Sequence, residues 1–216
     1  RYSPLPLSTT FMQPAVELPA PQPGLFALIR SDIRRKQEHY VLVNRFFNKW
    51  IKIGMQHGTL AVVVYRFGHW AFTRKSSLAR ALFGALYRSW ALPVTWLSRV
   101  YINPRTPIGS GFVIHNFSAV FVDAVSIGEN FTINQGVTIG PDYKHNGVPT
   151  LGDNVFLGSG AAVLGNVTLG NNVVVAANCL VGRSIASSSV VAGVPGIVVM
   201  KDIPADYVGS VPAHMK

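Results

Sequence analysis

Hydrophobic residues change their spacing along this chain near residue 104. Between residues 25 and 103, apolar residues recur three or four positions apart, with Arg, Lys and Trp between them. That spacing predicts α-helices, and Ser31, which precedes a charged run, is the expected N-cap of the first one. Pro93 is expected to break or kink the last helix, because proline cannot donate a helical hydrogen bond.

Beyond residue 104, aliphatic residues recur every six positions. The series is Ile108, Ile114, Val120, Ile127, Ile133, Ile139, Leu151, Leu157, Val163, Leu169, Val175 and Val181, and glycine often follows. A period of six matches neither an α-helix nor an ordinary strand. It matches a solenoid in which each hexad supplies one flat face and one corner, and three hexads complete a triangular coil. The sequence therefore predicts a mainly β fold, a parallel β-helix whose inward aliphatic residues stack between coils.

These two patterns divide the chain into four predicted parts. They are a loose Pro-rich tail at 1–24, a basic α-helical domain at 25–103, a β-helix at 104–201 with a loop excursion at 140–150, and a C-terminal tail at 202–216. The first residues lack the cationic and apolar stretches of a signal peptide, and no run of about 18 apolar residues predicts a spanning helix. The cytoplasm is the expected location, with the inner face of the membrane as an option.

A formal charge of +10, from 19 Lys and Arg against 9 Asp and Glu, predicts an acidic partner. Most of the cations lie in the helical domain, where Trp residues separate them. This pattern is typical of a packed helical cap with charged outer faces, and it also suits peripheral contact with anionic lipid or attraction to a glycan. No nucleic-acid-binding motif accompanies the charge, so nucleic acid is not an expected partner.

Several segments resemble one known family. The helical segments are RSDIRRK and YRFGHWAF, and the β-helical segments are INPRTPIGSGFVIHN, NQGVTIG, GVPTLGDNVFLGSGAAVLGNVTLGNNV and VAGVPGIVV. Across residues 27–201 the chain resembles the hexapeptide-repeat acyltransferases. It is most similar to the serine acetyltransferase-like branch, which includes capsule and exopolysaccharide O-acetyltransferases of the colanic acid type. The resemblance implies a left-handed β-helix, acetyl-CoA as cosubstrate, and assembly into a homotrimer or a dimer of trimers.

At several positions the chain departs from true serine acetyltransferases. Ile114 replaces the Asp before the catalytic His, Tyr101 and Asn103 replace an acidic residue and a His, and Gly147 and Val148 replace an Arg-His pair. In the family these residues hold the charged groups of serine or assist the base. We therefore expect the acceptor to be a hydroxyl of an acidic or neutral polysaccharide or of its sugar precursor. The alternative is a small molecule like serine.

Acetyl transfer to an alcohol needs a base for the hydroxyl proton, and the resemblance gives this role to His115. His115 follows the inward Ile114, so its side chain is expected to face a groove between subunits. Asp123 and Asp142 are candidates to orient the imidazole, although both also suit solvated corners. His145, in the excursion PDYKHNGVPT, is a candidate second acid or base, or else a solvated loop residue.

Small residues on the later coils form the expected acetyl-CoA site, because they let a pantetheine arm approach backbone groups. The candidates are Gly158, Gly160, Ala161 and Ala177, with Arg183 and Lys201 for the phosphates of CoA. The resemblance of VAGVPG to the family's end loop adds Gly193 and Pro195. Asn116, Tyr143 and Lys144 are candidate substrate contacts. Corner geometry alone would also require small residues at several of these positions.

Other chemistries have less support from the sequence. Cys179 lies inside the repeat without an adjacent His, so we expect a buried thiol and direct acetyl transfer without a covalent intermediate. A zinc hydratase of the γ-carbonic anhydrase type needs three converging His. Only His115 and His145 precede the C-terminal tail in the β-helix, so no metal site is expected. A non-catalytic scaffold that binds partners through its basic helices is the last alternative.

Overall fold

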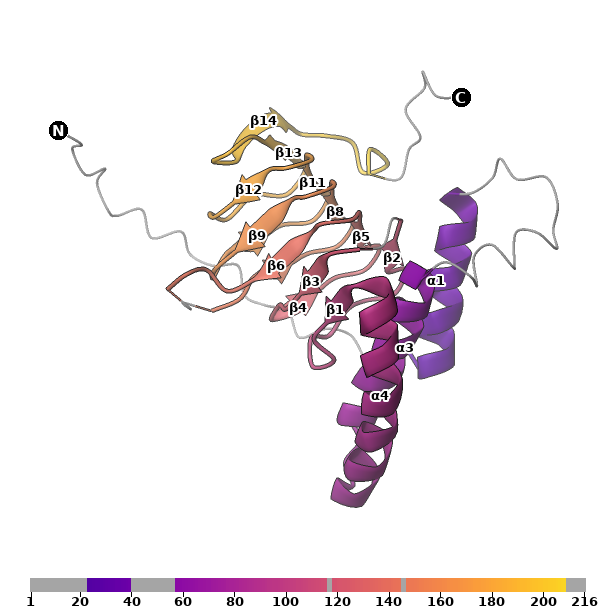
Figure 1. Ribbon diagram of the computed structural model, residues 1–216. Coiled ribbons are helices and arrows are strands. Elements are labelled where there is room, and N and C mark those ends of the chain that lie inside the picture. Colours follow the sequence, from indigo (N-terminus) through magenta and orange to yellow (C-terminus); the bar gives the residue numbers. More distant parts are fainter. Residues whose placement is uncertain (1–22, 40–56, 116–117, 145–146, 209–216) are drawn as a thin grey trace.

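Stacked coils of β-strand form the main body of the protein, and helices pack at the end where the first coil lies (Figure 1). The computed structural model describes residues 23–39, 57–115, 118–144 and 147–208. The helices within these ranges are α1 (Leu25–His39), α3 (His57–Phe72) and α4 (Ser77–Ser98). A β-helix with an N-terminal helical region is therefore confirmed.

Three sheets form the sides of the coils. Sheet A contains β1 (Val100–Ile102), β3 (Val120–Val122), β6 (Thr138–Gly140), β9 (Ala162–Leu164) and β12 (Leu180–Val181). Sheet B contains β4 (Ser126–Ile127), β7 (Thr150–Leu151) and β10 (Thr168–Leu169). Sheet C contains β2 (Val113–Ile114), β5 (Thr132–Ile133), β8 (Phe156–Leu157), β11 (Val173–Val175), β13 (Ser189–Ala192) and β14 (Ile197–Lys201). All pairings are parallel except that of β13 with β14, and the chain passes repeatedly from sheet C to A to B.

The aliphatic residues of the six-residue repeat form the core of the coils. Every member of the series from Ile108 to Val181 is buried. In sheet C, Ile114 pairs with Ile133, Ile133 with Leu157, and Leu157 with Val175. Equivalent positions therefore stack coil on coil, which is how a repeat that cannot bury its own inner face becomes stable.

Asparagine residues form one column of corners between sheets B and C. Asn130, Asn154 and Asn172 have φ values of 55°, 57° and 57°, a left-handed backbone that Asn tolerates better than β-branched residues do. The Asn154 amide donates to the Asn172 side-chain oxygen at 3.2 Å, and the Asn172 amide donates to the Ile203 carbonyl at 3.0 Å. The column thus connects neighbouring coils as well as turning the chain.

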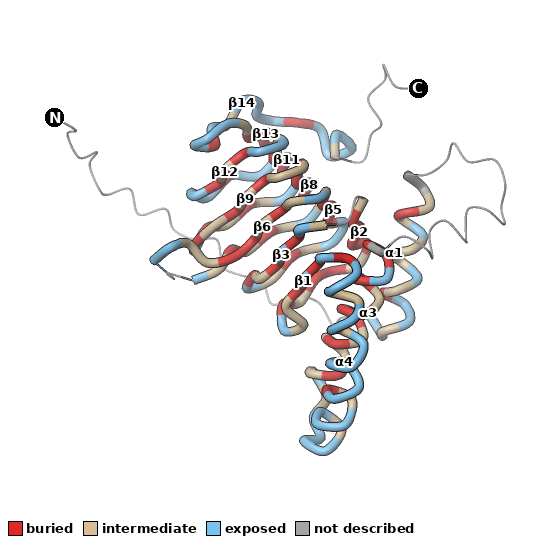
Figure 2. Tube along the Cα trace, in the orientation of Figure 1, coloured by how far each residue is buried: buried red, intermediate tan, exposed pale blue. Residues whose placement is uncertain are grey.

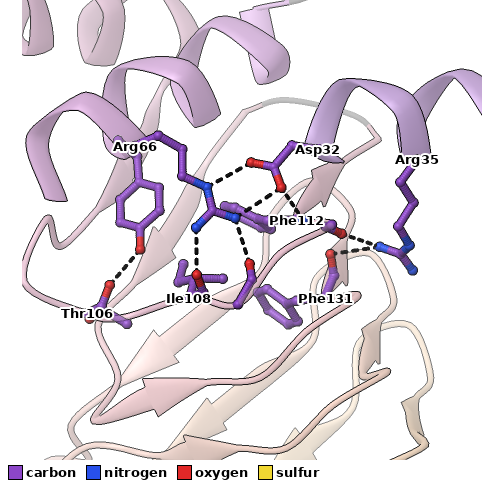
Figure 3. Close-up of polar contacts among 10 residues, drawn as sticks. Asp32, Arg35, Arg66, Thr106, Ile108, Phe112 and Phe131 are labelled. Carbon is purple, nitrogen blue, oxygen red and sulfur yellow. Dashed lines mark hydrogen bonds and ion pairs between the residues drawn. The ribbon is translucent and has the colours of Figure 1, made fainter. Parts of the chain in front are cut away.

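A buried ion pair attaches the helices to the first coil (Figure 3). The Arg66 guanidinium donates to both carboxylate oxygens of Asp32, at 2.8 and 3.0 Å, and the two side chains are 1% and 4% exposed. Arg66 also donates to the carbonyls of Ile108 and Gly109, both at 2.6 Å. Asp32 accepts a further bond from the Phe112 backbone N–H at 2.8 Å. The pair is therefore satisfied on both sides, as a buried charge requires.

Two further cations, both in α1, reach the same coil. Arg35 donates to the carbonyls of Gly111, at 2.6 Å, and Phe131, at 3.2 Å. Lys36 donates to the Ile114 carbonyl at 2.9 Å. Because β2 is the outer strand of sheet C, these side chains help to cover an edge that would otherwise expose unpaired backbone groups. The prediction that the cations lie on outer faces is therefore wrong for Lys36 and Arg66, which are buried.

The boundaries of the elements differ from the predicted ones in three places. α1 begins at Leu25, so Ser31 lies within the helix and is not its N-cap. α4 continues through Pro93 to Ser98, and its packing on α3, where Trp70 meets Phe83 edge to face, outweighs the unfavourable proline. The first strand of sheet A begins at Val100 and pairs with β3, so strand structure starts before residue 104.

Candidate functional site

His115 lies at a corner of the coils where the chain leaves sheet C and enters sheet A. Its backbone N–H donates to the Ile133 carbonyl at 3.0 Å, and the equivalent bonds of Asn134 and Gly158 reach the coils above at 3.2 and 2.8 Å. His115 is half-buried, whereas Ile114 before it is buried. We call this column of turns, at residues 115, 118–119, 134–137, 158–161 and 176–179, the His115 corner. It places the predicted base in line with predicted cofactor residues.

The glycines of the His115 corner allow successive coils to approach closely. A Cβ atom on Gly158 would lie 2.6 Å from the backbone nitrogen of Ala177. Gly160 has a φ of 71°, the left-handed region that glycine enters at little cost. Ala161 differs from the others because the whole residue is buried in the core and its N–H donates to the Gly158 carbonyl at 3.1 Å, so it offers no exposed surface to a ligand.

The loop at residues 193–196 closes the top of the same corner. The Leu180 N–H donates to the Gly193 carbonyl at 3.1 Å, and the Gly196 N–H donates to the Leu180 carbonyl at 2.7 Å. Pro195 follows a cis peptide bond in this loop and is exposed. Six of the eight predicted cofactor residues therefore share one corner with His115: Gly158, Gly160, Ala161, Ala177, Gly193 and Pro195.

The predicted acidic partners of His115 lie at the next corner, between sheets A and B. Asp123 follows β3 and accepts a hydrogen bond from the Asn103 side-chain amide at 2.8 Å. Asp142 follows β6, and its carboxylate accepts from the Lys144 N–H at 3.0 Å. Within one chain, the width of sheet A separates both carboxylates from the His115 corner. The structure therefore does not bring either of them to His115 in the same subunit.

The remaining predicted residues are scattered. Arg183 follows β12 at the corner between sheets A and B, and Lys201 ends β14 opposite Ser189, at the far end of sheet C from His115. Tyr143 and Lys144 are exposed in the excursion, with the Lys144 ammonium 5.5 Å from the Tyr143 ring centre. Asn116 and His145 lie outside the described residues.

Lys36 is a neighbour of the site that the sequence did not reveal. Besides the Ile114 carbonyl, its ammonium donates to the Thr59 hydroxyl of α3 at 2.8 Å. It thereby holds the residue immediately before His115, and burial lowers the pKa of Lys36 to about 8. A lysine in a helix with several cations is usually a surface residue. Only its contact across the boundary between helix and coil distinguishes it.

Cys179 is 1% exposed on the inner side of the His115 corner. Burial raises the pKa of the Cys179 thiol, which disfavours the thiolate that a nucleophilic cysteine needs. The structure thus agrees with the expectation of a buried thiol. Among the described residues, no group of three His, Cys, Asp or Glu side chains could hold a metal ion.

Comparison with known proteins agrees with the geometry. Residues 149–183 match the family model described as bacterial transferase hexapeptide (six repeats). This part of the chain is therefore similar to the hexapeptide repeats of bacterial transferases. It is 35% identical over 147 residues to a serine acetyltransferase of Synechococcus elongatus, covering 67% of this chain and 57% of that protein. It is 34% identical over 148 residues to a serine acetyltransferase of Staphylococcus aureus, covering 67% of this chain and 66% of that one. The chain thus spans a little over half to about two thirds of these relatives.

Solved structures show the same fold in other transferases. The Neisseria gonorrhoeae serine acetyltransferase superposes with a TM-score of 0.69 at 23% identity, over 86% of this chain and 70% of that one. A serine acetyltransferase in complex with CoA superposes with a TM-score of 0.68 at 23% identity, over 81% of this chain and 69% of that one. At such identities the likeness concerns the fold alone.

These relatives correct the predicted acceptor. The substitutions at Tyr101, Asn103, Ile114, Gly147 and Val148 led to the expectation of a polysaccharide hydroxyl. The relatives with about one third identity are named serine acetyltransferases, so the polysaccharide prediction is wrong and the small-molecule alternative is favoured. The prediction is wrong because the absence of charged residues at these positions does not exclude serine. Other residues of a site can bind the same charged groups of the substrate.

Proposed function

We propose that this protein transfers an acetyl group from acetyl-CoA to the hydroxyl of serine or of a small serine-like alcohol. The observation that carries the proposal is the His115 corner, where one imidazole lies in line with close-packed small residues. The serine acetyltransferase relatives support the size of the acceptor, and the complex of a serine acetyltransferase with CoA supports the donor. We also infer that the coils wind in the left-handed sense, as the hexapeptide repeat implies.

In the proposed reaction His115 accepts the hydroxyl proton as the acceptor oxygen attacks the thioester carbonyl. The tetrahedral intermediate then collapses, the bond between carbon and sulfur breaks, and the imidazolium returns the proton to the departing thiolate. The products are the acetyl ester and free CoA. The exposed backbone around Ala177 and Gly193 is where the pantetheine arm would lie, so that the thioester and the acceptor meet beside His115.

We propose further that three chains assemble, so that the His115 corner of one subunit faces the Asp123 and Asp142 corner of the next. Within one chain these corners are separated by sheet A, and a neighbour is the simplest way to bring a carboxylate near the base. Asp123, held by Asn103, could then receive the ammonium group of the acceptor. Asp142, Tyr143 and Lys144 would lie at the same boundary.

The decisive experiment measures release of the CoA thiol from acetyl-CoA in the presence of L-serine. We expect rapid, serine-dependent release by the wild type and a loss of about 10²- to 10⁴-fold in His115→Ala. The control is His214→Ala, which removes a histidine of the C-terminal tail and should leave the rate unchanged. Full activity in His115→Ala with its circular dichroism unchanged would show that another group is the base. Failure with L-serine, homoserine and ethanolamine alike would reject the acceptor class.

A shared site can be tested by mixing subunits. Sedimentation velocity should give the mass of three chains or a multiple of it. Co-expression of His115→Ala and Asp123→Ala chains should then recover part of the activity that each variant lacks alone, because some boundaries in the mixed assembly combine two intact corners. An active monomer, or no recovery in an assembled mixture, would contradict the shared site.

A further inference from the structure

Two adjoining cavities on the helical domain combine an apolar lining with arginine side chains. The first, of about 380 Å³, lies between α3, α4 and β1 and is lined mostly by aliphatic and aromatic residues such as Val64, Tyr87 and Leu92. The second, of about 460 Å³, is lined by three arginines, Arg80, Arg88 and Arg105. Phe72, Arg88 and Pro104 line both cavities, so an apolar hollow continues directly into a basic one. An amphiphile with an anionic head has this combination of properties.

The stretch of chain that lines these cavities carries charge of one sign. Residues 39–122 contain no Asp or Glu, whereas they contain ten Lys and Arg. The side chains of Arg80, Arg88 and Arg105 are exposed. The stretch itself supplies no carboxylate to neutralise them, and Asp123, which follows it, accepts a hydrogen bond from Asn103. The surface is therefore complementary to a negatively charged partner.

The outer face of α4 is apolar and open to solvent. Leu78, Leu82 and Leu86 follow one another at a spacing of four residues and are 78%, 65% and 43% exposed. Trp90 and Trp96 continue the exposed apolar surface at 58% and 87%. Figure 2 shows α4 exposed along much of its length, projecting beyond the end of the coils. Leucine and tryptophan on one face with arginine beside them are characteristic of helices that lie in the surface of a bilayer.

None of the described helices has both the length and the apolar character that crossing a bilayer requires. α4 itself carries Arg80 and Arg88 between its apolar residues. Contact of this helix with a membrane would therefore be limited to the interfacial layer, where long cationic side chains reach the phosphates while leucine and tryptophan contact the acyl chains.

We propose that α4 and the adjoining arginine cavity form a docking surface for an anionic phospholipid bilayer. Arg80, Arg88 and Arg105 bind the headgroup phosphates, and the outer face of α4 receives the acyl-chain region. The surface lies on the helical domain and the adjoining part of the first coil, apart from the His115 corner, and does not depend on the proposed reaction. Docking would hold the protein at a membrane face while the coils remain in water.

The test uses the whole chain and two kinds of vesicle. One is pure phosphatidylcholine, and the other is a 3:1 mixture of phosphatidylcholine with phosphatidylglycerol, which contains about 25% anionic lipid. We expect co-sedimentation with the anionic vesicles at low salt, release at high salt, and a blue shift of tryptophan emission on binding. Replacing all three arginines by glutamine (Arg80→Gln, Arg88→Gln and Arg105→Gln) should weaken binding by about tenfold or more. The matched control removes three cations from the coils, Lys144→Gln, Arg183→Gln and Lys201→Gln, and should bind nearly as well as the wild type.

Four outcomes would overturn the proposal. One is no binding to anionic vesicles, and another is equal weakening in the arginine variant and its control. A third is displacement from vesicles by glycerol phosphate at an equal headgroup concentration, which would make the arginine cavity a site for soluble anions. The last is dissociation of an oligomer by Leu82→Ser with Trp96→Ser while vesicle binding persists, which would make the α4 face a contact between copies of the chain.

Discussion

Lys36 shows how a single buried charge connects the helices to the site. Its side chain is 3% exposed and bonds to Thr59 and to the carbonyl of Ile114. Burial disfavours the ammonium form, which lowers the pKa from 10.5 to about 8. At neutral pH the protein therefore keeps a positive charge next to the residue that precedes His115, at a cost in stability.

This cost has a predictable pH dependence. Between pH 8 and 10.5 the unfolded chain binds a proton at Lys36 that the folded chain releases, so the free energy of unfolding rises with pH over this window. We expect a rise of about 2 kcal/mol between pH 8 and 9.5. Urea denaturation at several pH values measures it, and Lys36→Met should lack it. The same rise in Lys36→Met would assign the effect to another group.

Along the coils, glycines after the aliphatic positions control how closely neighbouring strands approach. A Cβ on Gly128 would lie 2.6 Å from the carbonyl carbon of Gly152 and 2.7 Å from the nitrogen of Asp153. Gly182 occupies the equivalent place after Val181 but has nothing within 4 Å. The same residue type in the same repeat position thus meets two different environments, because one has a coil above it.

The two glycines form a matched pair of substitutions. Gly128→Ala should lower the free energy of unfolding by about 2 kcal/mol or more, because backbone atoms of the next coil must move. Gly182→Ala should change it by less than about 0.5 kcal/mol. Thermal or denaturant unfolding of both variants measures the difference, and similar losses in both would show that close approach between coils is not the cause.

The contact between helices and coils depends on the pair of Asp32 and Arg66. Arg66→Met leaves the Asp32 carboxylate buried without its partner, so we expect a loss of about 3 to 5 kcal/mol in the free energy of unfolding. Arg80→Met removes an exposed arginine and should cost less than about 0.5 kcal/mol. Combining Asp32→Asn with Arg66→Met should cost less than the sum of the two single changes. Additive losses would mean that the two side chains act independently.

At the scale of the whole molecule, the helices cover the open end of the coils. β1 and β2 are the outer strands of sheets A and C, and Arg35, Lys36 and Arg66 bond to carbonyls at this end. At the other end, β14 turns back antiparallel to β13. Both devices limit pairing with another chain at an exposed sheet edge.

Removing the helices should therefore expose unpaired strand edges that can bind another chain. We expect a fragment of residues 99–216 to self-associate through its first coil, whereas the full chain under the same conditions does not aggregate. Light scattering as a function of concentration measures this difference. A fragment that stays as well dispersed as the full chain would show that the first coil needs no cover.

Much of the fold was predictable because its repeat is local. The aliphatic residues from Ile108 to Val181 specify the inner face by their period alone, and all of them are buried as expected. His115 was found by its resemblance to a family position, and its half-buried place after the buried Ile114 follows from the same period. Six of the predicted cofactor residues share its corner because a repeat of fixed length returns the chain to the same corner once in every coil.

The sequence by itself determined the period, and with it the core and the order of faces and corners, because stacking requires only that each hexad resemble the next. Only the tertiary structure decided which charges are buried and which residues share a corner. From the sequence, Lys36 and Arg66 are expected to be surface cations. The structure shows that they bind carbonyl and carboxylate partners far away in sequence. From the sequence, Asp123 is a candidate partner of His115, but in the structure one whole face of the coil separates them. Such contacts depend on distance in space, which the spacing of residues along the chain does not contain.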